Sequence, residues 1–238
     1  MTGFTEIWSY LSQGPLLWLT ATLAAYAAGD AAFRAAGRRP YVNPVLVAVV
    51  LLGSALWATA TPYATYFEGA QFVHFLLGPA TVALALPLWD NLGHVRRCAL
   101  PIAAALLAGS ATAVISALGV AWALGIRGEA LISLAPKSAT APVALGISDA
   151  IGGSPTLTAV LVILTGITGA VVATPLLNLL SLTDWRARGF AVGVAAHGIG
   201  TARAFQVNPL AGAFAAVGMG LNAVLTAFLA PAILRLFL

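Results

Sequence analysis

Residues 134–144 read LAPKSATAPVA, and this stretch decides what kind of fold the chain can have. Lys137, Ser138 and Thr140 lie between two prolines, in surroundings that are otherwise apolar. Each proline lacks a backbone N–H donor and disrupts a helix. A lysine at membrane depth is costly, so it needs water, a partner or a function. The stretch therefore predicts a broken or re-entrant membrane segment that presents one cation and two hydroxyl groups to an anion.

The composition on either side of this stretch indicates that lipid surrounds the protein. Of the 238 residues, 61% are hydrophobic and 8% are charged, whereas a soluble domain carries about 25% charged residues. Apolar stretches of spanning length occupy residues 14–34, 41–61, 98–124, 155–180 and 209–236. The sequence therefore predicts an all-α, polytopic transmembrane protein of the cell inner membrane. The net charge of +4 comes from cations scattered between these stretches, which suits membrane topology and not nucleic-acid binding.

Three further stretches are apolar but interrupted by glycine, proline and polar residues: 71–91, 129–151 and 187–206. Lipid offers no hydrogen bonds, so a helix can break at membrane depth only where protein or a water-filled cavity surrounds it. We expect broken or re-entrant helices in all three.

The arginines outside these stretches predict a topology. Placing the clusters at 34–39, 96–97 and 186–188 in the cytoplasm puts the N-terminus outside and the C-terminus, near Arg235, inside. This arrangement requires 129–151 to enter and leave on the same side, as a hairpin that turns between the two prolines. The alternative is that 129–151 spans the membrane and one arginine cluster breaks the rule.

The chain also resembles itself in two places. Residues 43–50 resemble 154–161, and residues 78–85 resemble 198–205. The second match sets Thr81 opposite Thr201. We therefore expect two membrane repeats, residues 7–124 and 125–238, which the predicted topology places in opposite orientations, as in many secondary transporters.

A second polar motif, AAHGIGTARA, occupies residues 195–204. Its candidate site residues are His197, Gly198, Gly200, Thr201 and Arg203. The glycines allow an unwound turn or a close backbone approach, and the histidine supplies a titratable group. The planar fork of an arginine matches a carboxylate. We expect this motif and the lysine motif to face one shared chamber.

Each of these residues also has a structural interpretation. Lys137 could extend to the membrane surface from a loop. Arg203 could pair with Asp149 or Asp30 only to hold helices together, and His197 could be a satisfied core residue.

The remaining candidates are less specific. Pro79 and Thr81 lie at the repeat-equivalent break and are expected to line the opposite wall, while Asp149 and His197 could carry a coupling proton. The single cysteine, Cys98, excludes an internal disulfide and a multi-cysteine metal site. We expect no metal and no cofactor. The chain contains no complete Gly-x-Ser-x-Gly nucleophile motif, so we expect no enzyme.

Four motifs resemble the LrgB/CidB family: GPATVALALPL at 78–88, PKSATAP at 136–142, IGGSPTLTAV at 151–160 and HGIGTARA at 197–204. The resemblance runs from about residue 14 to the C-terminus. It implies either a holin/antiholin-like regulator of murein hydrolase activity and cell lysis or a relative of plastid glycolate/glycerate translocators and pyruvate-linked bacterial proteins. It also implies a small LrgA/CidA-like membrane partner. The family usually has a serine where this chain has Ala196, and acidic residues where it has residues 205–208.

Residues and resemblance together predict a carrier of small monocarboxylates, such as glycolate, glycerate or pyruvate, that works by proton-coupled alternating access. Lys137 and Arg203 would bind the carboxylate, and Ser138, Thr140 and Thr201 would bind its other oxygens. The alternative is a holin/antiholin-like pore or lysis regulator. We expect a homodimer in the lipid bilayer and no nucleic-acid partner.

Overall fold

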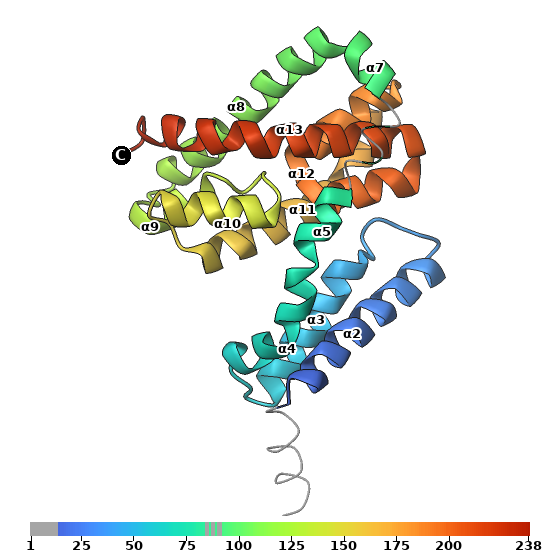
Figure 1. Ribbon diagram of the computed structural model, residues 1–238, viewed down its shortest axis with the longest axis vertical. Helices are drawn as coiled ribbons and strands as arrows, with labels where there is room; N and C mark the ends of the chain where they lie inside the picture. Colours follow the sequence, from blue (N-terminus) through green and yellow to red (C-terminus); the bar gives the residue numbers. More distant parts are fainter. Residues whose placement is uncertain (1–13, 84–85, 87–88, 90–91) are drawn as a thin grey trace, which may run out of the picture. The chain divides into compact units, whose positions relative to one another are not determined.

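The computed structural model describes residues 14–83, 86, 89 and 92–238, and in these residues all regular structure is helical. The chain divides into two compact units, residues 1–82 and 83–238 (Figure 1). Four helices are long and apolar enough to cross a membrane, namely α2, α8, α11 and α13. The predicted all-α membrane fold is confirmed. The repeat boundary at 124/125 stays a prediction, because a sequence repeat need not coincide with a compact unit.

The first unit is built around α2 (Pro15–Ala35). α2 packs against α3 (Pro44–Ala58) and α4 (Tyr63–Phe75), and α5 (Leu77–Ala83) follows. The Trp18 and Tyr66 rings meet edge to face at 5.8 Å between centroids. The predicted interrupted stretch 71–91 contains the change from α4 to α5, and part of it lies outside the described residues.

The second unit contains the two motifs singled out in the sequence. Its helices are α7 (Leu92–Arg97), α8 (Ala99–Ala123), α9 (Gly128–Leu134), α10 (Ala141–Ala150), α11 (Pro155–Leu179), α12 (Trp185–Val207) and α13 (Pro209–Leu234). α11 and α13 each begin with a proline in the first turn, where its missing N–H costs nothing. Ser154 and Asn208 precede these prolines and cap the two helices with their side-chain oxygens.

α13 is the central helix of this unit: half of its most apolar window is buried, against 22% for each of the other three candidate spans. Its neighbour α8 runs parallel to it. Ile102 belongs to the same core cluster as Phe214, Ser110 bonds Asn222, and Leu118 belongs to the same core cluster as Ala230. Residue numbers increase in the same direction along both helices, so the two helices begin at the same end of the unit.

α12 is a hairpin of two helical halves that are joined at a kink. The close approaches pair Gly189 with Ala211 and Gly193 with Ala215 in the first half, and Gly198 with Met219 and Gly212 with Phe205 in the second. The first half therefore runs parallel to α13 and the second half antiparallel. The reversal occurs at Ala196 and His197, the two residues with non-helical backbone angles. The interrupted helix predicted at 187–206 is thus re-entrant.

α9, residues 135–140 and α10 form another hairpin, here called the first hairpin, with α12 as the second. With 7 and 10 residues, α9 and α10 are each too short for a span of about 20 residues. Leu131 of α9 and Ile147 of α10 pack near Ile233, at the far end of α13. The first hairpin therefore enters the unit from the end opposite to the second (Figure 1).

The second hairpin changes the predicted topology. α12 returns to the end where it started, so α13 begins there as well and carries Arg235 to the other end. Our charge-based topology counted residues 187–206 as a span, and this placed Arg235 on the same side as Arg186. The structure places these two arginines at opposite ends of α13, because a hairpin does not change sides.

Candidate functional site

The two hairpins meet at the middle of α13, where the amide of Asn222 holds both. Its Nδ2 donates to the carbonyl oxygen of Ser138 at 3.0 Å and to that of Val194 at 3.1 Å. Asn222 lies 11 residues from both Ala211 and Ile233, or about 16 Å along the helix in each direction. That is about half the thickness of a hydrocarbon core of roughly 30 Å. Each hairpin therefore reaches mid-membrane from its own side.

Asn222 is 1% exposed, and its oxygen accepts hydrogen bonds from Ser110 of α8 and Thr226 of α13. Where a helix breaks, the carbonyls of the last turn lose their helical partners and need others. Asn222 provides that partner for Val194, just before the reversal in α12. The side chain thus connects α8, α13 and both hairpins.

His197 forms the turn of the second hairpin. Its φ of 40° and ψ of −137° fall in a region that residues other than glycine rarely adopt. The residue is 3% exposed, and its Nε2 lies 2.8 Å from the carbonyl oxygen of Val162 in α11. A carbonyl oxygen only accepts hydrogen bonds, so Nε2 carries the hydrogen. The backbone oxygen of His197 accepts a bond from the Thr201 hydroxyl at 2.8 Å.

Two glycines of α11 make room for this turn. A methyl group at Gly166 would lie 2.6 Å from Cε1 of His197, and one at Gly169 would overlap Cβ of Ala196. In both cases the two carbon atoms would be closer than a van der Waals contact allows. The reversal in α12 therefore depends on small residues in a different helix.

Lys137 lies in the turn of the first hairpin, among buried neighbours. Its ammonium group is 3.4 Å from Oγ of Ser138 and is close enough to His197 to interact with it electrostatically. Within the part of the chain that the structure describes, the ion pairs are Asp30–Arg34 and Asp184–Arg186, so Lys137 has no carboxylate partner there. It is also the only lysine in the chain.

Thr140 is buried and precedes α10 as its N-cap residue, but its side chain makes no capping bond. It lies beside Ala139 and Ala144, which pack against Val162. Because His197 bonds the same Val162, the structure brings together Lys137, Ser138, Thr140, His197 and Thr201. Gly198 follows the reversal and faces α13, since a methyl group at this position would lie 3.8 Å from Sδ of Met219.

The unwound turn lies one residue before the glycines that we expected to form it. Gly198 and Gly200 are helical, and the reversal falls on Ala196 and His197. Gly200 instead permits the two halves of α12 to approach, because a methyl group there would lie 2.6 Å from Cβ of Ala196 and 3.2 Å from the carbonyl oxygen of Val192. The glycines are thus packing residues next to the turn.

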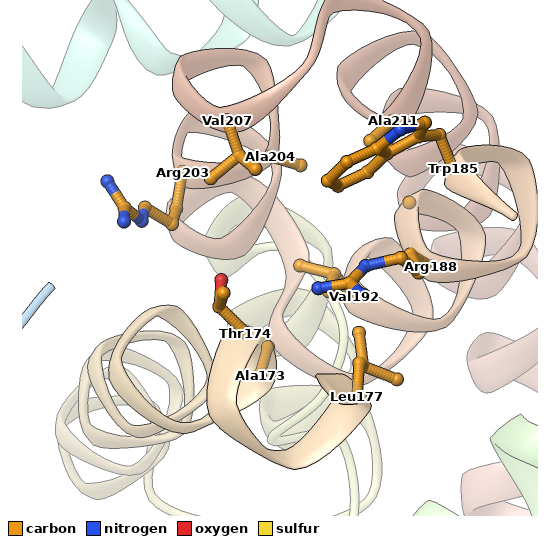
Figure 2. A pocket seen from close by; sticks show the side chains of 11 residues that line it. Ala173, Thr174, Leu177, Trp185, Arg188, Val192, Arg203, Ala204, Val207 and Ala211 are labelled. Atoms are coloured by element: carbon orange, nitrogen blue, oxygen red, sulfur yellow. The ribbon is translucent and has the colours of Figure 1, made fainter. Parts of the chain in front are cut away.

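Arg203 lines a different cavity, between the last turns of α11, both ends of α12 and the start of α13 (Figure 2). Its neighbours there include Thr174, Trp185 and Arg188. Lys137 does not line this cavity, so the structure does not bring the two expected cations into one chamber. Of the two acids considered as partners of Arg203, Asp30 bonds Arg34 at 3.0 Å, and Asp149 is exposed near the end of α10.

Pro79 and Thr81 lie in α5 of the first unit, and Pro79 is exposed. Their role as the opposite wall stays a prediction. Asp149 follows Thr140 by nine positions, or about 13 Å along α10, and its role in proton coupling is likewise untested. Among the described residues, no group of three or more histidines, cysteines or acids could hold a metal ion.

Sequence reasoning missed two sets of residues. One is a buried polar cluster that ties the first hairpin to α11: the Thr158 hydroxyl donates to the Ser133 carbonyl at 2.9 Å and bonds the Ser148 hydroxyl at 2.7 Å. The other is Arg188, which we treated only as a topology signal and which is 8% exposed. The pattern of polar positions in α9–α11 could have indicated the cluster; a helix-initial arginine gives no sign of burial.

Comparison with known proteins places these features in a family. The profile of the LrgB-like family matches residues 22–236. The uncharacterized protein YxaC of Bacillus subtilis is 36% identical over 198 residues, which cover 83% of this chain and 86% of that protein. The holin-like protein CidB of Staphylococcus epidermidis is 30% identical over the same shares of each chain. No solved structure is significantly similar.

Proposed function

Because this chain belongs to the LrgB-like family, we propose that it acts as a holin-like protein that controls the passage of small solutes across the inner membrane, without enzymatic activity. Relatives named holin-like protein CidB align with 83% of it. The observation that carries the proposal is the meeting of two opposed hairpins at Asn222. A half-membrane hairpin on each side leaves polar backbone and side-chain groups where a solute would cross.

A second candidate, a selective carrier of small monocarboxylates, is favoured by Lys137. Its half-buried ammonium has no carboxylate partner in the described residues, and the Ser138 hydroxyl is beside it. A cation kept inside a membrane protein marks a functional site by default. A carboxylate of glycolate or pyruvate size would supply the missing negative charge, and the nearby His197 is the group that we propose for proton coupling.

Solute release from proteoliposomes distinguishes the two functions. A holin-like pore releases trapped dyes and sugars without saturation. A carrier leaves these solutes inside and takes up radiolabelled glycolate, glycerate, pyruvate or lactate at a rate that saturates. Uptake by Lys137→Ala and Arg203→Ala is compared with that of Arg127→Gln, which removes an exposed cation stacked on Trp122. If Lys137→Ala takes up these solutes at the native rate, Lys137 is not part of a carrier site.

The single lysine allows a direct chemical test of its surroundings. An amine-reactive reagent modifies Lys137 and the N-terminus, and Lys137→Arg identifies the signal of the former. For the carrier, we expect glycolate to slow this modification and an equal concentration of chloride to leave it unchanged. Equal rates in both anions would exclude carboxylate binding at Lys137 and leave the holin-like function standing.

The resemblance also suggests partners. We propose that the chain forms a homodimer and associates with a small LrgA/CidA-like membrane protein. Crosslinking in native membranes, followed by mass spectrometry, tests both associations: a crosslinked species at twice the 24.2 kDa mass indicates the dimer, and a smaller increment indicates the partner.

A further inference from the structure

Arg188 is a buried cation that the site at Asn222 does not use. Its side chain is held in place by hydrogen bonds from Nη1 to the Leu182 carbonyl and from Nη2 to Oδ1 of Asn178, both at 2.8 Å. The guanidinium also lies over the Trp185 ring, 4.8 Å from its centroid. All three partners are neutral, and no carboxylate in the described part of the chain pairs with Arg188. Its positive charge is therefore fixed in position and not neutralised by those partners.

The cavity beside Arg188 contains the means to bind an anion. A guanidinium has five N–H donors, and the bonds to Leu182 and Asn178 come from two of its nitrogens. Thr174 adds a hydroxyl group, and Arg203 lines another wall, with its guanidinium pointing away from Arg188 (Figure 2). The other lining residues are mainly apolar, as in most small-ligand pockets. Electrostatic attraction is stronger beside such apolar walls than in open water.

The size of the cavity restricts the ligand. Its volume is about 30 Å³, where roughly 10–15 Å³ on the same measure holds one water molecule. This is room for one small, compact group. A carboxylate or phosphate group is compact, carries the required charge and matches the planar fork of an arginine.

We propose that the cavity lined by Arg188, Arg203 and Thr174 is an anion site that binds a single carboxylate or phosphate group. Arg188 provides the fixed cation, and Arg203, which is half-buried and points away from Arg188 in Figure 2, turns toward the bound oxygens from the other wall. Trp185 forms one side of the site.

This anion site is separate from the meeting point of the hairpins. It lies where α11 ends and α13 begins, whereas Asn222 is 11 residues further along α13 than Ala211, which lines the cavity. The inference therefore goes beyond the proposed function and does not depend on it: binding at this end of the second hairpin can be measured whether or not the protein transports a solute.

Tryptophan fluorescence measures this binding, because Trp185 lines the cavity. The full-length protein is placed in phosphatidylcholine nanodiscs and titrated with glycolate or inorganic phosphate at constant ionic strength, with chloride as the reference. We expect a saturable change in emission that Trp185→Phe removes. Arg188→Gln and Arg203→Gln should each weaken the apparent affinity at least about tenfold, the loss expected for one charge-assisted contact.

Arg186→Gln is the matched control, because Arg186 is two positions away, exposed and paired with Asp184. We expect its affinity to stay within about twofold of the native value. Arg188 also holds Asn178 and Leu182, so its substitution can disturb folding; Arg203→Gln and Thr174→Val test the site independently of that contact.

Phosphatidylglycerol nanodiscs identify the source of the anion. If a lipid phosphate occupies the site, these nanodiscs reproduce the emission change before any titration, and Arg203→Gln reverses it. If a free anion is the ligand, the titration is the same in both lipids. The proposal is overturned if neither lipid nor free anion changes the emission, or if Arg186→Gln weakens binding as much as Arg203→Gln.

Discussion

The two hairpins of the second unit reach the same depth by different means. The first hairpin turns over six residues, 135–140, with Pro136 buried inside the turn. The second hairpin turns at two residues, Ala196 and His197, with a left-handed φ at the histidine. The first is joined to α11 by hydroxyl groups, and the second is joined to α11 and α13 by close contacts at small residues.

This difference shows that a chain can turn at mid-membrane in two ways. A long turn exposes more backbone groups and needs polar partners for them. A short turn exposes fewer groups but requires neighbouring helices without side chains in the way, as in the small-residue interfaces of membrane proteins. We therefore expect the first hairpin to be sensitive to the loss of hydroxyl groups and the second to the addition of volume.

The largest effect should come from adding one methyl group next to the short turn. In Gly169→Ala the new methyl overlaps Cβ of Ala196, and overpacking of this kind costs about 3 kcal/mol. Gly220→Ala in α13 is the control, because nothing lies within 4 Å of its new methyl. Unfolding in mixed detergent micelles measures both. Similar stabilities for the two variants would show that the turn adapts and that the comparison is wrong.

The next largest effect should come from Asn222→Ala, which affects both hairpins. Two bonds to carbonyl oxygens are lost, and interhelical bonds in membranes are each worth about 0.6–1.7 kcal/mol, so we expect about 2 kcal/mol. Hydrogen–deuterium exchange should increase at Ser138 and at Val194 together. Thr226→Val, which removes one 3.3 Å bond to the same side chain, should change exchange little. An increase confined to one hairpin would contradict a shared attachment.

A smaller effect, restricted to the first hairpin, is expected for Thr158→Val. The substitution keeps the shape of the side chain but removes its bonds to Ser133 and Ser148, which should cost about 1 kcal/mol. Thr168→Val in the same helix is the control, since Thr168 is exposed. Exchange in α12 should be unaffected. Destabilisation of the second hairpin by Thr158→Val would show that the two are not independently attached to α11.

The smallest effect is expected at Asp184, which begins the second hairpin. Bonds from the Arg186 side chain and backbone N–H lower the pKa of this carboxyl group to about 2. Because the folded-state pKa is below the unfolded value, the stabilisation is present above about pH 4 and is lost as the pH falls toward about 2. The difference in melting temperature between the native chain and Asp184→Asn should follow this course and decrease in high salt.

Four of the five predicted spans correspond to helices long enough to cross a membrane, because length and hydropathy determine a span in lipid. The prediction at 41–61 was wrong in length: that stretch contains α3, which has only 15 residues. The first hairpin was predictable as well: the prolines at 136 and 142 mark both ends of the turn, and the segments beside them are short. Lys137, Ser138 and Thr140 of this hairpin lie near His197. The position of His197, in turn, depends on how α12 packs against α11.

A broken or re-entrant helix was expected over 187–206, but the position of its reversal, at Ala196 and His197, could not be predicted. The glycines that suggested an unwound turn, Gly198 and Gly200, are helical. The residues that permit the reversal are Gly166 and Gly169 in α11, about 30 positions earlier in the chain. The charge-based topology counted 187–206 as a crossing and so put Arg235 on the side of Arg186, whereas the two lie at opposite ends of α13. Arg203 lines a cavity that does not include Lys137. Sequence patterns report local preferences, whereas this turn is imposed by contacts distant in sequence.

The amide of Asn222 gives the two hairpins a single point of attachment. Its NH₂ group bonds the backbone of both hairpins near their turns. Neither hairpin can withdraw from the centre of the bilayer without breaking a hydrogen bond to that nitrogen. A movement of either hairpin therefore disturbs the side chain that also holds the other.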